Sequence, residues 1–318
     1  MAKARAIVKR RKAVRNIRKI TKTMQMIATA KFQKSLRRAV GTKPYSRKVR
    51  ELVRELAASV GNVEHPLLRR PGPADRTHRI ALLVITSNRG LAGAYNGNVL
   101  RKVMGFIRQQ EAAGNGIDLY ITGKKGTTYF NYQRRPIIQR VDVSDAVKFA
   151  EIEPTADRFI EDFTSGKVDA VYVAYMNFVS AGLQKAEVIS LLPLSGTEDA
   201  AGGATTAGKG SAGAASTAPG AGAPAPASSG QHAIYDFLPG PEELLNELLP
   251  LTVRTALFQA YLDAATSEHV ARMVSMKSAT DNADKMVKSL TMRYNRARQS
   301  QITTELSEIM GGVEAMNA

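Results

Sequence analysis

Residues 251–310 read LTVRTALFQAYLDAATSEHVARMVSMKSATDNADKMVKSLTMRYNRARQSQITTELSEIM, a run of sixty residues without a glycine or a proline. Residues 1–40 form a second such run at the other end of the chain. Because glycine and proline disfavour helix interiors, these runs predict two long helices, roughly 90 Å and 60 Å long at 1.5 Å rise per residue. No compact domain encloses helices of that length. The pattern predicts a rod built from both ends of the chain and favours a mechanical role over catalysis.

Apolar and small residues recur along both runs at alternating spacings of three and four, which is typical of a seam against a partner helix. In the first run the expected seam comprises Val14, Ile17, Thr21, Met24 and Ala28, widened by Ile20 and Ile27. In the last run it comprises Leu257, Ala260, Ala264, Ser267, Ala271, Val274 and Ser278, and then shifts to Met276, Ala279, Ala283, Met286 and Leu290. We expect an antiparallel coiled coil of these two helices, from which the longer one overhangs.

The middle of the chain alternates apolar runs with helical stretches, which predicts an α/β layer with a largely parallel sheet. The expected strands are 80–86, 118–122, 168–178, 186–192 and 233–238, and the expected helices are 98–113, 124–132 and 145–165. Strands 168–178 and 186–192 are expected to form an antiparallel hairpin at the sheet edge. Gly41 and Pro44 are expected to break the first helix, and Pro154 to interrupt the helix at 145–165.

The predicted organisation has three parts within the α/β class. These are an N-terminal coiled-coil helix (1–60), a Rossmann-like α/β globular domain (74–240) and a C-terminal coiled-coil helix (241–318). The globular domain carries an insert at 199–230. Residues 200–230 contain only Ala, Gly, Ser, Thr and Pro apart from Lys209. Because such a segment buries too little apolar surface to offset its ordering entropy, we expect a flexible surface loop there.

The basic residues are concentrated on the first helix. Eighteen of the 45 Lys and Arg lie within residues 1–50, and the first acidic residue is Glu51, while the remainder holds 27 basic against 28 acidic residues. Such a face predicts an acidic or phosphate-bearing partner. The absence of cysteine excludes disulfides, thiolate metal sites and cysteine nucleophiles, and the four dispersed histidines favour no metal centre. No apolar run approaches the roughly 20 residues that a membrane span needs.

Two other functional classes remain as alternatives. The glycine-rich loop SNRGLAGAYNG (87–97) follows a strand and precedes a helix, where phosphate-binding loops occur, but its GxxGxxxG spacing matches no nucleotide-binding fingerprint. A tight turn explains it better than an enzyme site. The basic first helix would also suit a coiled-coil nucleic-acid-binding protein. Against this second alternative, the helix shares an apolar seam, Phe32 is its only aromatic residue before Tyr45, and no nucleic-acid motif is present.

Three stretches resemble one family, the gamma subunit of the rotary F-type ATP synthase. Residues 17–31, IRKITKTMQMIATAK, are similar to its first-helix signature, residues 87–96, SNRGLAGAYN, resemble its S-D-R-G-L-C-G loop, and residues 267–312 match its most characteristic segment. Asn88 stands where the family usually has Asp, and Ala92 where it often has Cys, so the charge and thiol chemistry of that loop do not carry over. The insert lies where chloroplast-type members carry a redox segment, but a chain without cysteine cannot form a dithiol switch.

The resemblance implies a non-catalytic central-stalk subunit that transmits torque between a proton-driven membrane rotor and a catalytic ring during ATP synthesis or hydrolysis. It implies partners in the alpha and beta subunits of that ring, the epsilon subunit and the membrane rotor ring of c subunits, with no cofactor and no nucleic acid. It further implies a peripheral location on the cytoplasmic face of the bacterial plasma (inner) membrane.

The resemblance also implies which residues contact the ring. By motif match these are Lys19, Lys22, Met24, Arg272, Arg298, Gln299 and Thr303. Met24 lies on the expected seam as well, so core packing stays open as its alternative role. In an antiparallel pair, Ile302, Leu306 and Ile309 have no apolar partner within the chain at their height. We expect these three to fit an apolar sleeve at the top of the ring.

Overall fold

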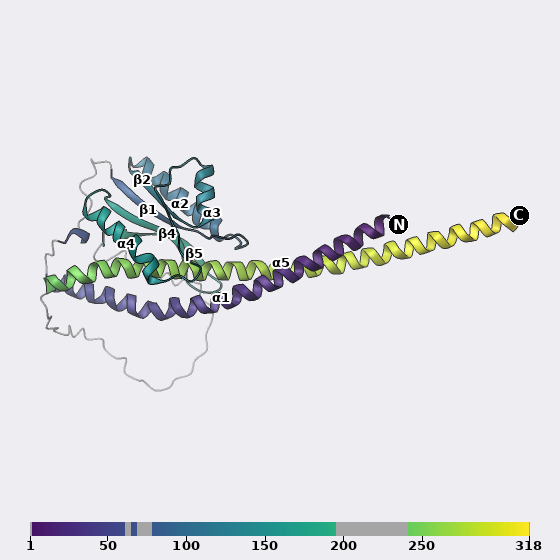
Figure 1. The fold of residues 1–318 in the computed structure, drawn as a ribbon, viewed down its shortest axis with the longest axis horizontal. Helices are drawn as coiled ribbons and strands as arrows, with labels where there is room; N and C mark the ends of the chain where they lie inside the picture. The colour runs from purple at the N-terminus through teal and green to yellow at the C-terminus, as the bar shows by residue number, and fades with distance from the viewer. Residues whose placement is uncertain (1, 61–64, 69–77, 195–240, 318) are drawn as a thin grey trace, which may run out of the picture.

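The protein consists of a globular domain and a long helical shaft that leaves it on one side (Figure 1). The computed structural model describes residues 2–60, 65–68, 78–194 and 241–317. The shaft is formed by two helices, α1 (Ala2–Val60) and α5 (Pro241–Asn317), which run antiparallel and wind around each other. The C-terminus lies at the far end of the shaft, beyond the N-terminus. The predicted antiparallel pair with an overhanging longer helix is therefore confirmed.

The globular domain is built on a five-stranded sheet in the order β3-β2-β1-β4-β5. The strands are β1 (Arg79–Ile85), β2 (Gly116–Thr122), β3 (Gln139–Val141), β4 (Ala170–Phe178) and β5 (Gln184–Leu192). The helices between them are α2 (Tyr95–Ala112), α3 (Lys124–Tyr132) and α4 (Phe149–Thr164), and a single 3-10 turn, η1 (Pro66–Leu68), precedes β1. All neighbouring strands pair in parallel except β4 and β5, which form the predicted antiparallel hairpin at the edge. The three-residue β3 was not predicted.

Helix α5 belongs to the core of the domain as well as to the shaft. Side chains of β1 alternate, so that Leu82 and Val84 pack on the α2 side of the sheet, while Leu83 packs on the side of α4 and α5. The first part of α5 contributes buried side chains to this second core, including Leu249 and Leu257. Because one unbroken helix carries residues of the core and of the shaft, the shaft cannot turn independently of the sheet.

Two expected helix breaks do not occur. Helix α1 continues through Gly41 and Pro44, and α4 continues through Pro154. A proline removes one backbone hydrogen bond, and tertiary packing can offset that loss. Pro154 lies near the beginning of α4, whose later residues Ala156 and Phe159 are fully buried in the core. Helix α1 is held by its contact with α5 along this stretch.

Most residues of the predicted seam between α1 and α5 are buried or half-buried, but six of them are exposed. On α1, Val14 and Ala28 are buried as predicted, and the buried Val49 and Leu56 follow them at multiples of seven, which is the period of a left-handed coiled coil. Ile17, Ile20 and Ile27 were expected in the seam and are instead exposed, as are Val274, Ser278 and Met286 of α5. Two helices bury only a narrow strip on each other, so the outer side chains of a wider apolar stripe stay exposed.

Contacts along the seam fix its register. Val14 packs in one cluster with Ala283 and Leu290, and the Thr280 hydroxyl donates to the Thr21 hydroxyl across 2.9 Å. Further along, the guanidinium of Arg11 lies 4.9 Å from the centre of the Tyr294 ring. Arg18 and Asp284 form an ion pair beside the seam. As residue numbers fall on α1 they rise on α5, which places the start of α1 near residue 300 of α5.

Some expectations concern parts of the chain outside the described residues. The insert at 199–230, the strand at 233–238 and most of the segment between η1 and β1 lie there. Within the described residues, none of the helices is both long enough and apolar enough to cross a membrane.

Shortening a core residue of α5 tests its double role. Leu257 is fully buried, whereas Leu306 on the same helix is 55% exposed. We expect Leu257→Ala to lower the free energy of unfolding by about 2–5 kcal/mol, because a cavity is left in the core. The matched control Leu306→Ala should change it by less than about 0.5 kcal/mol. Urea unfolding followed by circular dichroism measures both, and equal losses would show that α5 is not part of the domain core.

Candidate functional site

The free end of α5 carries an apolar row that nothing in the described chain covers. Every residue from Ile302 to the end of α5 whose side chain is described is exposed. Ile302, Leu306, Ile309, Val313 and Met316 follow one another at spacings of four and three, with exposed fractions of 49–88%. That spacing places them on one side of the helix. Arg298, Gln299 and Thr303 lie beside this row and are exposed as well.

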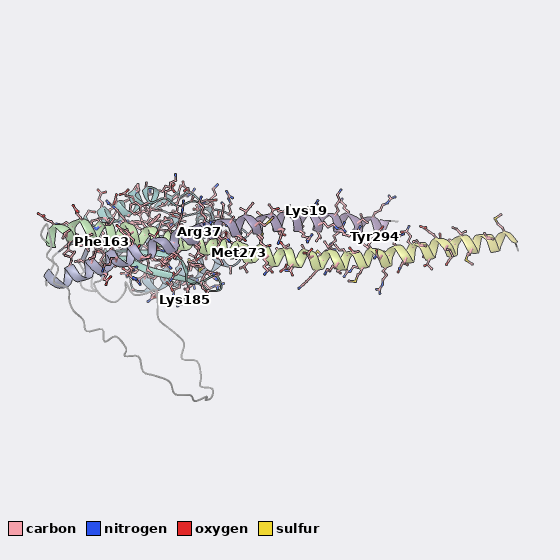
Figure 2. All side chains as sticks on the ribbon, turned by 90° about the horizontal axis from the view of Figure 1, so that it is seen from below. Lys19, Arg37, Phe163, Lys185, Met273 and Tyr294 are labelled. Atoms are coloured by element: carbon pink, nitrogen blue, oxygen red, sulfur yellow. The ribbon has the colours of Figure 1, made fainter. Side chains whose placement is uncertain are left out.

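A second group of predicted contact residues lies lower on the shaft, between its tip and the globular domain. Figure 2 shows Lys19 there, well away from the domain. Lys19 and Lys22 are exposed and line a shallow groove between α1 and α5. The other residues of this groove are Arg18, Thr23, Gln25, Lys277, Thr280, Asp281 and Asp284. Met24 is half-buried, so its side chain reaches both the seam and the surface.

Arg272 differs from the other predicted contact residues because its guanidinium is bound inside the chain. It forms an ion pair with Glu268 at 2.7 Å and donates to the backbone carbonyls of Arg89 (3.3 Å) and Gly90 (3.4 Å). Its side chain is only 13% exposed. Arg272 therefore fastens the loop after β1 onto α5, at the neck where the shaft leaves the domain.

The same loop meets α5 through a glycine. Gly93 has φ +54°, and a Cβ at this position would lie 2.6 Å from the Ser275 hydroxyl oxygen. Positive φ and close approach both favour glycine over any other residue. Gly93 is thus explained by its positive φ and its packing on the shaft, in agreement with the tight turn that the sequence favoured over a phosphate-binding site.

The two departures from the family pattern are accommodated in this loop. The Asn88 side-chain oxygen accepts a hydrogen bond of 3.2 Å from the backbone N–H of Lys124, at the start of α3. An aspartate would present the same acceptor, so the amide keeps the bond without the charge. Ala92 is buried in the core on the α2 side, where a small apolar side chain suffices.

Ionisable side chains from four segments gather at the neck, namely α1, the loop after β1, the loop before α4, and α5. Lys31 of α1 pairs with Asp145 at 2.7 Å, and Arg89 lies 3.7 Å from the same carboxylate. The hydrogen bond from Lys31 lowers the pKa of Asp145. His269 of α5 is buried, and loss of solvation, with the nearby Arg272 and Lys31, lowers its pKa to about 4, against an opposing effect of Asp145. Burial raises the pKa of Glu268, and Arg272 opposes that rise.

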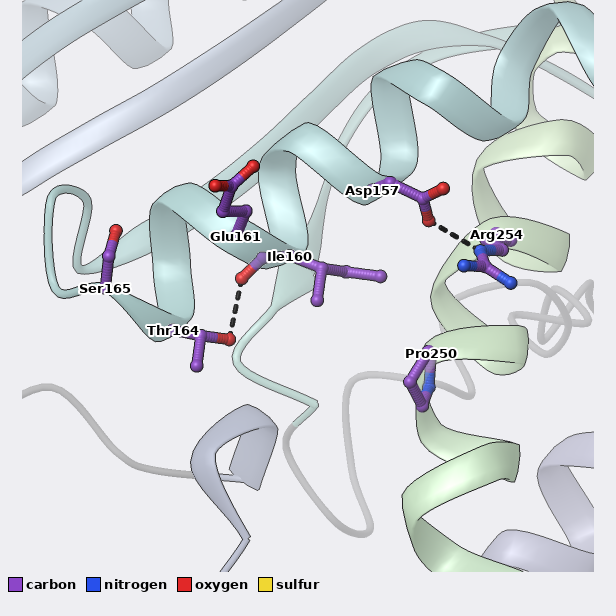
Figure 3. A pocket seen from close by; sticks show the side chains of 7 residues that line it. All are labelled: Asp157, Ile160, Glu161, Thr164, Ser165, Pro250 and Arg254. Carbon is purple, nitrogen blue, oxygen red and sulfur yellow. Dashed lines mark hydrogen bonds and ion pairs between the residues drawn. The ribbon is translucent and has the colours of Figure 1, made fainter.

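A cleft between α4 and α5 shows no arrangement of catalytic groups (Figure 3). It is lined by Asp157, Ile160, Glu161, Thr164, Ser165, Pro250 and Arg254. Arg254 donates to Asp157 at 2.6 Å, and Thr164 donates to the carbonyl of Ile160 at 2.7 Å. These contacts join α4 to α5 and leave no nucleophile paired with a base.

The sequence of the whole chain was compared with known families and proteins. The family model described as ATP synthase matches residues 3–316. An ATP synthase gamma chain of Rhodopirellula baltica is 38% identical over 317 residues, which cover 99% of each chain. One of Leptospira biflexa is 36% identical over 318 residues, which cover 100% of each.

This chain belongs to the ATP synthase gamma chain family.

Solved structures agree on the fold of the gamma chain. A chain of the Euglena gracilis mitochondrial ATP synthase, described as OSCP/F1/c-ring, superposes with a TM-score of 0.61 at 17% identity, covering 99% of this chain and 95% of that one. The Tetrahymena thermophila central stalk/c-ring gives 0.54 at 20% identity, covering 82% of this chain and 99% of that one. None of these comparisons supports the nucleic-acid-binding alternative.

The structure distributes the predicted gamma-chain contact residues over separate levels. Lys19, Lys22 and Met24 lie on the lower shaft, Arg272 lies at the neck, and the remaining predicted residues lie at the tip. Sequence reasoning missed Val313 and Met316, although the predicted helix includes them and they continue the spacing of the tip row. It also missed the packing of the loop after β1 on α5, since no local sequence pattern shows which helix a loop will contact.

Filling the close approach at Gly93 tests the neck of the gamma chain. Gly93→Ala combines a strained backbone with a clash against Ser275, so we expect a loss of about 1–3 kcal/mol in the free energy of unfolding. Gly97→Ala, in the first turn of α2, meets no atom within 4 Å and serves as the control. Denaturant titration measures both variants. Equal stability of the two would contradict the described contact.

The buried His269 predicts a loss of stability in acid. The unfolded state binds a proton near pH 6.5 and the folded state only near pH 4, so acidification through this window favours unfolding. This residue should lower the free energy of unfolding by about 2 kcal/mol between pH 7 and pH 5. His269→Gln should lack that part of the loss. Urea titrations at both pH values measure it, and an unchanged acid loss in the variant would show that another group is responsible.

Proposed function

We propose that this chain is the central-stalk rotor subunit of an F-type ATP synthase, with no catalytic role of its own, and that its shaft transmits torque between a membrane rotor and a catalytic ring. The observation that carries the proposal is the free end of α5, an exposed apolar row on a helix anchored in the sheet core. Membership in the gamma chain family supports it. A long helix that is fixed at one end and exposed at the other suits a subunit whose free end is bound by other proteins.

The unequal length of α1 and α5 supplies the asymmetry that such a role requires. A ligand shifts a conformational equilibrium only by its differential affinity for the two states. A shaft that contacted every catalytic subunit alike would therefore favour no state over another. One face of the shaft carries α1 up to about the level of residue 300 of α5, and above that level α5 continues alone. In each orientation, this asymmetric shaft presents a different surface to each surrounding subunit.

The two levels of the shaft suit two kinds of contact. At the tip, Ile302, Leu306 and Ile309 would turn within an apolar sleeve of the alpha and beta subunits. Lower down, Lys19 and Lys22 would meet acidic segments of the same ring. Solvated ion pairs are each worth only about 0–1 kcal/mol, so they can exchange during rotation without trapping one orientation. Arg272 is not included, because the neck accounts for its charge.

The globular domain would face the membrane rotor, at the end of the shaft opposite the catalytic ring. We assign its partners as the epsilon subunit and the ring of c subunits, and its location as peripheral, on the cytoplasmic face of the bacterial inner membrane. The similarity in fold to chains of structures described as OSCP/F1/c-ring and central stalk/c-ring supports this assignment. So does the position of the domain, which lies at the end opposite the tip (Figure 1).

Charged substitutions in the tip row test the proposed sleeve. We expect the double variant Ile302→Asp/Leu306→Asp to reduce ATP synthesis by reconstituted complexes at least tenfold. Burying unpaired carboxylates in the sleeve costs several kcal/mol, and a loss of about 1.4 kcal/mol already corresponds to a tenfold lower rate. Thr304→Asp, on the opposite side of the same helical turns, is the matched control and should leave synthesis within twofold.

Assembly must be measured beside activity. Co-purification of each variant with the ring subunits separates a failure to assemble from a failure to couple. If the double variant assembled and made ATP as the unmodified chain does, the sleeve would be ruled out. If the unmodified chain did not co-purify with the ring at all, the proposed function itself would fail.

A further inference from the structure

Helix α1 is intrinsically weak in one short stretch, although it is continuous there. Gly41 has nothing within 4 Å of the position of a Cβ, so no packing contact requires a glycine. Pro44 has no N–H, which leaves the carbonyl of Val40 without its helical donor. Glycine and proline are the two least favourable residues in a helix interior. In isolation, residues 40–44 would be expected to bend or break.

Helix α5 contacts α1 just before this stretch and within it. The Gln259 side chain donates to the backbone carbonyl of Ala39 at 3.5 Å, just before Gly41. The Asp263 carboxylate lies 3.6 Å from the Lys43 ammonium group, just before Pro44. Gln259 and Asp263 are one turn apart on α5, so a single face of that helix holds α1 at two successive points.

These polar groups lie in a buried part of the seam, where apolar side chains would lose less free energy on removal from water. Asp263 is 4% exposed, and burial raises its pKa, opposed by Lys43 and by a hydrogen bond from Gln259. One oxygen of each of Gln259 and Asp263 is buried without a hydrogen-bond partner in the protein, and so is the hydroxyl of Ser46, one turn after Lys43. Buried polar groups of this kind cost stability, and in other coiled coils they set register. A positioning role explains why such groups lie opposite the weak stretch.

We infer that Gln259 and Asp263 are positioning residues that keep α1 continuous across an intrinsic hinge at Gly41 and Pro44. With the hinge closed, the part of α1 beneath the globular domain and the part in the shaft move as one body. The inference concerns the chain by itself and does not depend on the proposed function.

Amide hydrogen exchange of the full-length chain tests this inference. Asp263→Asn keeps the shape of the side chain and removes the charge that attracts Lys43. We expect exchange of the amides in residues 39–48 to rise at least tenfold in this variant. Arg254→Gln is the matched control, because it breaks ion pairs of α5 with α4 and leaves those with α1. It should leave exchange in residues 39–48 unchanged.

Replacing Pro44 distinguishes a contact that holds a hinge closed from an ion pair that stabilises any helix. Pro44→Ala restores the missing N–H and removes the larger of the two causes of the hinge, so in this background Asp263→Asn should raise exchange less than threefold. The same increase in both backgrounds, or no increase in either, would overturn the inference. If Asp263→Asn does not fold, Lys43→Gln replaces it, since that side chain is 46% exposed and its substitution leaves the core intact. The same two criteria apply to it.

Discussion

The contact between α1 and α5 holds the rest of the structure in place, because neither helix buries enough of itself to persist as an isolated rod. Its seam repeats every seven residues on α1, from Val14 to Leu56, and includes small and hydroxyl side chains that let the two backbones approach. Where the seam passes beneath the sheet, α5 also packs on β4 and α4. The coiled coil and the globular domain therefore share a core.

This sharing explains how a local loop can matter to a distant tip. The loop after β1 is held on α5 by Arg272 and by the close approach of Gly93 to Ser275, at the level where α5 leaves the domain. Lys31 and Asp145 tie α1 to the domain at the same neck. Since both shaft helices are fastened there, a rotation of the sheet is passed to both.

Much of this arrangement could be predicted from the sequence, and the failures have physical causes. Long runs without glycine or proline identify the helices, and IALLVIT identifies the central strand, because these patterns are local. Pro44 and Pro154 were misread because tertiary packing overrode a local cost. Ile17, Ile20 and Ile27 were misplaced because spacing shows that a stripe exists and not which side of it meets the partner. The short β3 and the contacts of Arg272 depend on residues far away in sequence.

The pairing of the first helix with the last has a consequence for biosynthesis. Thr21 and Thr280 form a hydrogen bond although 259 residues separate them. At roughly 5–20 residues per second, a ribosome needs on the order of tens of seconds to make that interval. Throughout this time α5 has not been made, so nothing covers the apolar stripe of the nascent amino-terminal segment. This segment carries eighteen basic residues and no acidic residue before Glu51. Newly made chains thus pass through a period of exposure to chaperones and to polyanions such as ribosomal RNA, which ends only when translation does.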